Sequence, residues 1–347
     1  MASISTLKIN SYFFMGILFL IFAMFAFIIG VLIGVDYIVM TVIFLLITVF
    51  YVAISPLIMK LSSRVRYLEK GEIPYLEEKV SKLAKEADIP MPRLGIVEDP
   101  TPNAFVFGLS QRGSTLAVHR GILEMLNDGE MEAVLAHEIG HIKNRDCMYM
   151  TILSVLPAIA MWGMQLLFMA RFAPRGRDAG KAVAVMLLIG LVSAIVYYLS
   201  TLLIKRLSRI REFYADAFSG FLTKDPHSLA SALTKITYGL SLAPPEEKSK
   251  ARMRQFYIGD VQNAHSEMDR IYRNSSKYDL DGDGIIDENE LELAMADEAN
   301  RSAWERWGGL MRTHPPTFKR ILALKEMEKE MDKGVVESDN IYEKVEF

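Results

Sequence analysis

A His-Glu-x-x-His pattern near the middle of the chain has the residue types of a metal-dependent hydrolase. His137 and His141 are four residues apart, so on an α-helix their imidazoles lie on the same face and can reach one tetrahedral Zn²⁺. Glu138 follows the first histidine and could accept a proton from a water molecule that the metal activates. Two ordinary histidines on an ordinary helix are the alternative, and a third ligand decides between the two interpretations.

A second pair of residues could supply that third ligand, because a catalytic zinc ion takes three protein ligands and keeps one position open for water. Glu212 and Asp216 are also four residues apart, and therefore share one face of a helix. One of them can bind the metal while the other hydrogen-bonds a ligand histidine. The alternative is that both acids pair with Arg209 and Arg211 at a membrane surface.

Four long apolar runs predict membrane-spanning helices around these motifs. Residues 12–35 and 37–59 are separated only by Asp36, and each has at least the roughly 20 residues that a helix needs to cross a bilayer. The first run is too long for a signal peptide, so we expect it to remain as an anchor. Residues 148–169 and 182–204 predict a second hairpin; buried helices of a large soluble domain are the alternative for this pair.

Basic residues beside these runs predict the orientation in the membrane. The turn inside the first hairpin has no basic residue, whereas four follow the hairpin: Lys60, Arg64, Arg66 and Lys70. This difference predicts that the chain after residue 59 lies in the cytoplasm. The loop inside the second hairpin argues against this orientation, because it would lie outside the cell and has four basic residues: Arg171, Arg175, Arg177 and Lys181. Basic residues also flank the second hairpin on both sides, so we keep the cytoplasmic assignment.

The segment between the two hairpins has the signals of a helix, a small sheet and the motif helix. Apolar periodicity predicts a helix over residues 75–87, which Pro90 and Pro92 close. Strand-like pieces follow at residues 93–97, 103–107 and 114–120. The motif helix is expected to begin near Asn127 or Asp128, because both residue types are good N-caps.

Composition favours a protein with membrane spans and a water-exposed domain. Hydrophobic residues make up 51% of the 347 residues and charged residues 23%, which is too apolar for an ordinary soluble protein and too charged for spans alone. The net charge of −3 gives no sign of a nucleic-acid partner. Because Cys147 is the single cysteine, no disulfide can form within the chain.

The chain resembles the HtpX-type membrane zinc metalloproteases, which are distant relatives of the CAAX prenyl endopeptidases. The resemblance runs from about residue 12 to residue 324 and rests on four motifs in order: PNAF at 102–105, HEIGHIKNRD at 137–146, REFYADA at 211–217 and THPP at 313–316. By this resemblance the fold is a mostly α-helical membrane protein, with four transmembrane helices and a zincin-type metalloprotease domain that contains a small β-sheet.

The resemblance also implies a role for each residue of the site. The zinc ligands are expected to be His137, His141 and Glu212, with Glu138 as the catalytic base and Asp216 as the acid that hydrogen-bonds a ligand. The substrate is expected to pair with an edge strand formed by Asn103, Ala104 and Phe105.

His314 has two interpretations. Beside two prolines it could simply end a helix, but the family pattern returns this His-Pro segment to the active site. We then expect His314 to act in catalysis, in contact with an Asp or Glu near the metal or with the oxyanion. Which role it takes stays open at this point.

One stretch, DLDGDGIIDENEL from residue 279 to residue 291, departs from the family. It has acids and a backbone carbonyl at the ligand positions of an EF-hand calcium loop: Asp279, Asp281, Asp283, Ile285, Asp287 and Glu290. Ca²⁺ is therefore expected as a second cofactor beside Zn²⁺. Because EF-hands pack in pairs, dimerisation or packing on the protease domain must replace the missing partner.

The expected organisation alternates membrane and protease segments. These are a transmembrane hairpin (1–59), the first half of the protease domain with the motif helix (60–147), a second hairpin (148–204), the second half with the third ligand (205–244), an insert with the calcium loop (245–305) and a C-terminal helical part (306–347).

We expect a multi-pass protein of the cell membrane that hydrolyses peptide bonds at the cytoplasmic face. By resemblance its substrates are unfolded or damaged membrane proteins, and its role is protein quality control in the stress response. The alternative is a calcium-responsive membrane binding protein with a structural metal site. The intact Glu138 argues against it, because a structural site needs no base. The sequence leaves the oligomeric state open.

Overall fold

The computed structural model describes residues 4–172, 179–241, 268–269, 271–281, 290–291, 293–294 and 314–334. The chain divides into two compact units. The first contains Met1–Leu7, Ile58–Met148 and Ser208–Phe347, and the second contains Lys8–Leu57 and Tyr149–Leu207.

The second unit consists of the apolar parts of four helices. These belong to α1 (Ile4–Ile33), α2 (Tyr37–Ser62), α6 (Asp146–Met164) and α8 (Ala179–Thr223), while α7 (Leu166–Met169) and the 3-10 turn η1 (Ala170–Phe172) follow α6. Four stretches of the described chain are long and apolar enough to cross a membrane: Tyr12–Ile33, Tyr37–Ser62, Asp146–Met169 and Gly180–Thr223.

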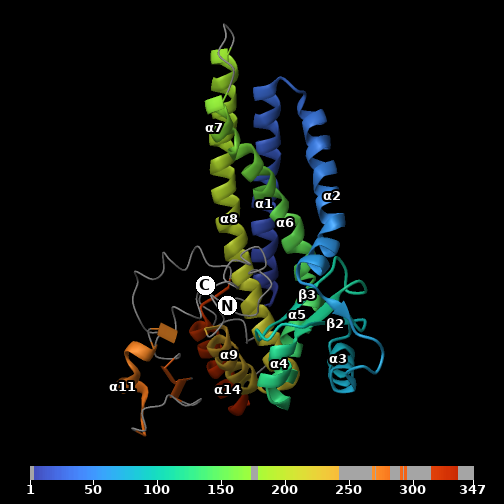
Figure 1. Cartoon of the computed structure of the whole chain (residues 1–347), viewed down its shortest axis with the longest axis vertical. Helices are drawn as coiled ribbons and strands as arrows, with labels where there is room; N and C mark the ends of the chain where they lie inside the picture. Colours follow the sequence, from blue (N-terminus) through green and yellow to red (C-terminus); the bar gives the residue numbers. More distant parts are fainter. Residues whose placement is uncertain are drawn as a thin grey trace. The chain divides into compact units, whose positions relative to one another are not determined.

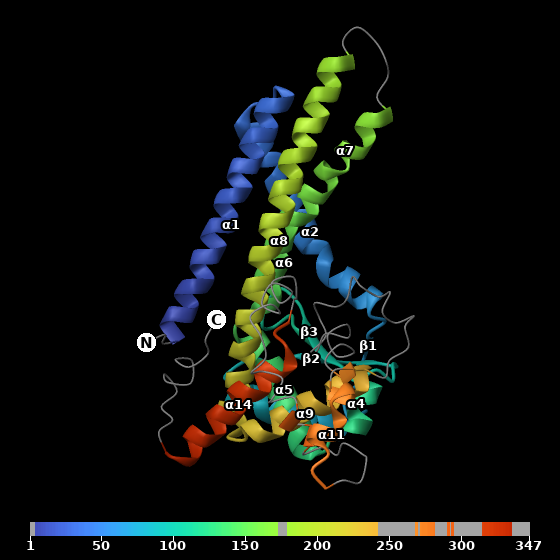
Figure 2. The same ribbon diagram turned by 90° about the vertical axis from the view of Figure 1, so that its left-hand side faces the viewer.

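Packing inside the second unit relies on aromatic and small side chains. The rings of Phe22 and Phe25 lie edge-on to Phe44, with ring centres 5.5 and 5.7 Å apart, and join α1 to α2. Gly163 of α6 lies so close to Ser193 of α8 that a Cβ atom there would be 2.2 Å from the serine Oγ. Small residues allow such close helix contacts within a membrane. Figure 1 and Figure 2 show the four helices as long rods.

The first unit contains a four-stranded mixed sheet. Its strands are β1 (Arg66–Tyr67), β2 (Arg93–Val97), β3 (Ala104–Phe107) and β4 (Thr115–His119), in the order β1-β2-β4-β3. β2 and β4 are parallel, and the other two pairs are antiparallel. The three predicted strands are present. Strand β1 was missed, because two residues are too few to show the alternation by which strands are recognised.

The first unit also contains the end of α8, from Ser208 to Thr223, and further helices. They are α3 (Pro74–Glu86), α4 (Arg120–Met125), α5 (Asp128–Lys143), α9 (Pro226–Ser241), α11 (Ser275–Tyr278) and α14 (Thr317–Asp332). Helix α5 begins where the sequence predicted, in a capping box: the Asn127 Oδ1 accepts from the Glu130 N–H (2.9 Å) and the Glu130 Oε2 from the Asn127 N–H (2.8 Å). Both Figure 1 and Figure 2 show α9 and α14 side by side, and these helices pack on each other.

The expected fold class is confirmed: the chain is mostly helical, with four candidate spans and a small sheet. Helix α8 runs without a break from Ala179 to Thr223, and the division between the two units falls inside it, between Leu207 and Ser208. No proline lies between the apolar run and Glu212 to end the helix. The same helix therefore continues from a candidate span into the first unit.

Candidate active site

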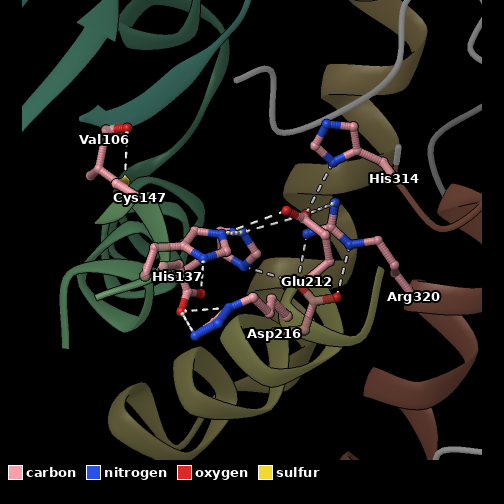
Figure 3. A network of polar contacts seen from close by, with 10 residues as sticks. Val106, His137, Cys147, Glu212, Asp216, His314 and Arg320 are labelled. Carbon is pink, nitrogen blue, oxygen red and sulfur yellow. Dashed lines mark hydrogen bonds and ion pairs between the residues drawn. The ribbon is translucent and has the colours of Figure 1, made fainter. Parts of the chain in front are cut away.

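Three helices of the first unit contribute the polar residues of the predicted site. α5 contains His137, Glu138 and His141, α8 contains Glu212 and Asp216, and Arg320 lies in α14 just after His314. Figure 3 shows the imidazole of His137 directed toward Glu212, with His314 and Arg320 on the opposite side of that carboxylate.

A glycine inside the motif lets α8 approach α5. A Cβ atom at Gly140 would lie 3.0 Å from a ring carbon of Phe218 and 3.4 Å from the Cα of Ala215. A hydrogen bond from the Ser219 Oγ to the Ala133 carbonyl (2.6 Å) joins the two helices one further turn along. The close contact of these helices brings the third predicted ligand to the two histidines.

The three predicted metal ligands converge. The Nε2 atoms of His137 and His141 are 3.2 Å apart. Glu212 Oε1 lies 3.6 Å from the His141 Nε2, and Glu212 Oε2 lies 3.9 Å from the His137 Nε2. The three groups can each direct one ligand atom to a common point, since those atoms all lie within 4.8 Å of one another.

Each imidazole is fixed from behind by a carboxylate. His137 Nδ1 lies 3.0 Å from Asp216 Oδ1, and His141 Nδ1 lies 2.7 Å from Asp146 Oδ2. A carboxylate at Nδ1 favours the tautomer that carries its proton there, so each Nε2 presents a lone pair.

The same two carboxylates are each held by an arginine. Arg320 donates to both oxygens of Asp216, through Nε (2.8 Å) and Nη2 (2.6 Å). Arg211 reaches Asp146 Oδ1 through Nε (3.0 Å) and Nη2 (2.7 Å). Arginine forms such two-point contacts because its donors have a fixed fork geometry.

The donor set fits a metal ion of the zinc type. Two lone pairs and a carboxylate that face each other in a buried space repel unless a cation lies among them. Two nitrogens bound to one tetrahedral zinc, each at about 2.0–2.1 Å, are roughly 3.3–3.4 Å apart, which is close to the observed 3.2 Å. Nitrogen ligands with a single carboxylate also suit zinc better than calcium or magnesium.

Glu138 lies beside this cluster with the properties of a proton acceptor. It is 3% exposed. Burial raises the pKa of its carboxyl above the ordinary value, although the charges of His137 and His141 act in the opposite direction. A raised pKa brings a carboxylate closer to the pH at which a general base works best.

His314 and Arg320 both contact the third predicted ligand. His314 Nδ1 and Arg320 Nη1 each lie 3.3 Å from Glu212 Oε2. The sequence analysis expected a contact between His314 and an acid near the metal, and the structure has one; the catalytic role of His314 stays a prediction. Burial lowers the pKa of Arg320, but Asp216 and Glu212 raise it more strongly, so the guanidinium remains charged.

The sequence analysis missed two residues of this network. Asp146 was inside a quoted motif but was given no role. Arg320 was not singled out, although a group with so many acids needs a buried cation. The alternative in which Arg211 pairs with the two acids of α8 differs from the structure, because Arg211 pairs with Asp146.

Asn103, Ala104 and Phe105 lie at the start of an edge strand. Ala104 and Phe105 belong to β3, and the backbone oxygen of Asn103 accepts from the His119 N–H (2.9 Å). The Cys147 thiol donates to the Val106 carbonyl of β3 (3.3 Å), a contact drawn in Figure 3. Because Cys147 follows Asp146, this contact joins the edge strand to the residues that hold His141.

Part of the acidic loop is described. Carboxylate oxygens of Asp279, Asp281 and Glu290 lie within 4.8 Å of one another. Glu290 Oε1 accepts from the backbone N–H groups of Leu280 (2.6 Å) and Asp281 (3.4 Å). The other predicted ligands, Asp283, Ile285 and Asp287, lie outside the described residues.

Apolar residues on both sides of this loop belong to the protease core. Ile271, Tyr278, Leu291 and Ala294 are buried in the same core cluster as residues of α5, α9 and α14. Packing on the protease domain was one of the two expected substitutes for a second EF-hand.

Comparison with known proteins identifies the family. The profile described as Peptidase family M48 matches residues 71–328. Protease HtpX homolog 2 of Methanosarcina acetivorans is 35% identical over 267 residues, which are 76% of this chain and 76% of that protein. The Protease HtpX homolog of Moorella thermoacetica is 36% identical over 256 residues, 73% of this chain and 85% of that protein.

A solved structure, the crystal structure of S. mikatae Ste24p, is similar with a TM-score of 0.44 and 20% identity, over 67% of this chain and 59% of that one. The matches to HtpX proteins confirm the resemblance that the motifs indicated. The family match covers well over half of the chain and includes both halves of the metal cluster. The chain belongs to peptidase family M48 and is a membrane metalloprotease.

Proposed function

We propose that the protein is a zinc endopeptidase with His137, His141 and Glu212 as its zinc ligands and Glu138 as its base. The observation that carries the proposal is the convergence of the three ligand groups within 4.8 Å, with a buried carboxylate on the same helix. A bound zinc ion polarises the carbonyl of the scissile peptide bond and lowers the pKa of a water molecule.

The residues of the chain perform the remaining work. Glu138 takes a proton from the attacking water and passes it to the leaving amine. Asp216 and Asp146 keep the two imidazoles in the orientation that ligation needs. His314, whose Nδ1 lies 3.3 Å from Glu212, donates to the oxygen on which negative charge develops or holds Glu212 in place.

The substrate binds in extended form along β3. The edge position of β3 in the described sheet supports the proposal, because the backbone groups at a strand edge can pair with an added strand; the Val106 carbonyl at this edge already accepts from Cys147. Asn103, Ala104 and Phe105 form its first part.

Glu138→Gln tests the catalytic proposal. Wild-type protein purified in detergent should cleave casein, and chelators should abolish the cleavage. The variant should keep its zinc yet lose about 10²- to 10⁴-fold in turnover, because only the base is removed. Glu124→Gln, a change at an exposed position of α4, is the matched control and should be fully active. Full activity of a zinc-loaded Glu138→Gln protein would contradict the mechanism.

We further propose that the site faces the cytoplasm and acts on unfolded or damaged membrane proteins. The basic cluster after residue 59 supports this side, and the HtpX relatives support the substrate class by analogy alone. In a Cys147→Ser background, Lys70→Cys and Lys333→Cys should resist an impermeant thiol reagent added to intact cells. Labelling of either position from outside would reverse the orientation.

Calcium binding by the acidic loop belongs to the same proposal. The loop pattern and the convergence of Asp279, Asp281 and Glu290 support it. The alternative function, a calcium-responsive binding protein with a structural metal, is not favoured by the family comparison.

A further inference from the structure

Two basic side chains lie against one aromatic ring at the end of the second candidate span. Lys60 Nζ is 4.2 Å and Arg93 Cζ is 4.5 Å from the centre of the Tyr67 ring. Lys60 belongs to the last turn of α2, Tyr67 to β1 and Arg93 to β2. We call these three residues the Tyr67 cluster.

The sheet fixes the geometry of the Tyr67 cluster. Tyr67 pairs in register with Gly95. The N–H of the next residue, Leu68, donates to the Leu94 carbonyl (3.0 Å). The Arg93 N–H donates to the Ser114 carbonyl (3.0 Å). The ring and one of its two cations are therefore held by strand pairing, and not by side-chain contacts alone.

The positive charges of this cluster are not balanced by nearby acids. Arg66, the neighbour of Tyr67, pairs with Glu72 (2.7 Å) and lies 3.7 Å from Glu98, and Glu98 also pairs with Arg120. Lys60 and Arg93, in contrast, form no ion pair with any residue that the structure describes. Since both contact the same ring, two unbalanced positive charges lie close together and attract an anion.

The position of the Tyr67 cluster in the chain indicates the source of that anion. The last turns of α2 expose large apolar side chains at Leu57 (54%), Ile58 (51%) and Leu61 (66%), as expected of a helix surface covered by lipid tails. Lys60 lies within this same stretch. Basic and aromatic side chains at the end of a span are typical of the headgroup layer of a membrane.

We propose that Lys60, Tyr67 and Arg93 bind the headgroup of an anionic phospholipid. Phosphate oxygens accept hydrogen bonds from the ammonium group of Lys60 and the guanidinium group of Arg93, which both lie against the Tyr67 ring. Met59, beside Lys60, is buried in one cluster with Phe105 and Phe107 of β3. If β3 binds substrate as proposed above, the bound lipid also steadies the end of α2 that supports this strand.

Lipid competition tests the proposal with the full-length protein. The protein is reconstituted in liposomes of phosphatidylcholine and phosphatidylglycerol and extracted in detergent, and the co-purified lipids are quantified by mass spectrometry. Wild type should be enriched in phosphatidylglycerol, and Lys60→Gln/Arg93→Gln should lose roughly fivefold of this enrichment for each charge removed.

Two further variants make the result decisive. Lys85→Gln/Lys333→Gln removes the same charge from exposed positions of α3 and the end of α14 and should keep the wild-type enrichment. Lys60→Arg/Arg93→Lys keeps both charges and should restore it, which excludes misfolding as the cause. Equal enrichment in the Gln variant and wild type would overturn the proposal. A second result would also overturn it. If inorganic phosphate protects the detergent-solubilised protein from heat as well as phosphatidylglycerol does, the ligand is a free anion and not a lipid.

Discussion

The metal cluster and the acidic loop gather three ligand groups each, but they are built in opposite ways. In the cluster, His137, His141 and Glu212 come from two helices far apart in the sequence, and all three are largely buried. In the loop, Asp279, Asp281 and Glu290 come from one short segment, and Asp281 is exposed. Asp281 is open to water, whereas Glu290 is 5% exposed and Glu212 of the cluster 7%, so the two groups differ most in where along the chain their ligands come from.

The charge balance of the two groups differs accordingly. Arg320 is 1% exposed and neutralises Asp216 while it also contacts Glu212. In the loop, Glu290 Oε1 accepts from the backbone N–H groups of Leu280 and Asp281 in its own segment. The acids of the cluster are thus neutralised by a side chain from another helix, and we expect a bound cation to reduce the repulsion among the acids of the loop.

The largest effect should follow from Arg320→Met. The change leaves Asp216 and Glu212 as buried carboxylates without their cation, which costs about 3–5 kcal/mol of unfolding free energy when one partner of a buried pair is removed. A fall in the midpoint of thermal or urea unfolding, together with lost zinc, is the expected result. Calcium binding by the loop should survive in any protein that remains folded.

Lys319→Met is the matched control for this prediction. Lys319 precedes Arg320 on α14 but is exposed, so its loss should change the unfolding free energy by no more than about 0.5 kcal/mol. Arg320→Lys keeps the charge but loses the two-point contact, and should fall between the two. Equal stability of Arg320→Met and wild type would show that the cluster needs no internal cation.

A smaller effect is expected from Asp146→Asn, which weakens the support of one ligand. The amide oxygen can still accept from His141 Nδ1, as the carboxylate does at 2.7 Å, but it carries no negative charge, so zinc affinity should fall about 10- to 100-fold. Competition with a chromogenic chelator measures this directly, without reference to activity. Asp216→Asn should lose a comparable factor through His137, while Glu124→Gln should lose none.

The contributions of Asp146 and of Arg211, which holds Asp146, can also be measured separately. Arg211→Gln leaves Asp146 in place but removes its two-point contact, so the affinity should fall less than in Asp146→Asn. An affinity in Asp146→Asn equal to that of wild type would mean that the helix alone orients His141.

The parts of the site that the sequence predicted are those with short-range patterns. The spacing of His137, Glu138 and His141 defines a helix face, and Asn127 marks the start of that helix. The acid pair of α8 also shows helical spacing. The third ligand that the His motif requires favoured metal binding over pairing with Arg209 and Arg211, and the family resemblance then assigned Glu212 as the ligand and Asp216 as the acid that supports a ligand. Arg320 could not be found in this way, because its partner Asp216 is 104 positions away in the chain and no local rule joins them.

The fold shows the same limit. Apolar runs and turn residues predicted the helices and three strands. The parallel pairing of β2 with β4 places β3 at the edge, and strand order is not encoded by any periodicity within a strand. The length of α8 was not predicted either, because the apolar run and the acid pair were recognised as separate patterns, and no helix-ending residue lies between them.

An effect below that of Arg320→Met is expected at the acidic loop. Calcium should bind with measurable heat in calorimetric titration of the zinc-loaded protein. If the ion binds the folded state alone, calcium at about 100 times the Kd should add about 2.7 kcal/mol to the unfolding free energy. Glu290→Gln should remove this heat, because it weakens the terminal ligand that chelates with two oxygens. Glu288→Gln removes the same charge from position 10 of the loop, which supplies no ligand, and should bind calcium as wild type does.

Casein cleavage measured in parallel separates a structural loop from a regulatory one. Ile271, Tyr278, Leu291 and Ala294 beside the loop share a core cluster with residues of α5, α9 and α14. Because α5 contains His137 and His141, we expect any effect of calcium on cleavage to pass through this packing. If cleavage changes with calcium in wild type and in Glu288→Gln but not in Glu290→Gln, the two groups of ligands are coupled. Binding without any change in cleavage would leave calcium a stabilising role only. No binding heat in wild type would remove the calcium site, and the contrast between the two groups would then be one between a metal site and a solvated acidic turn.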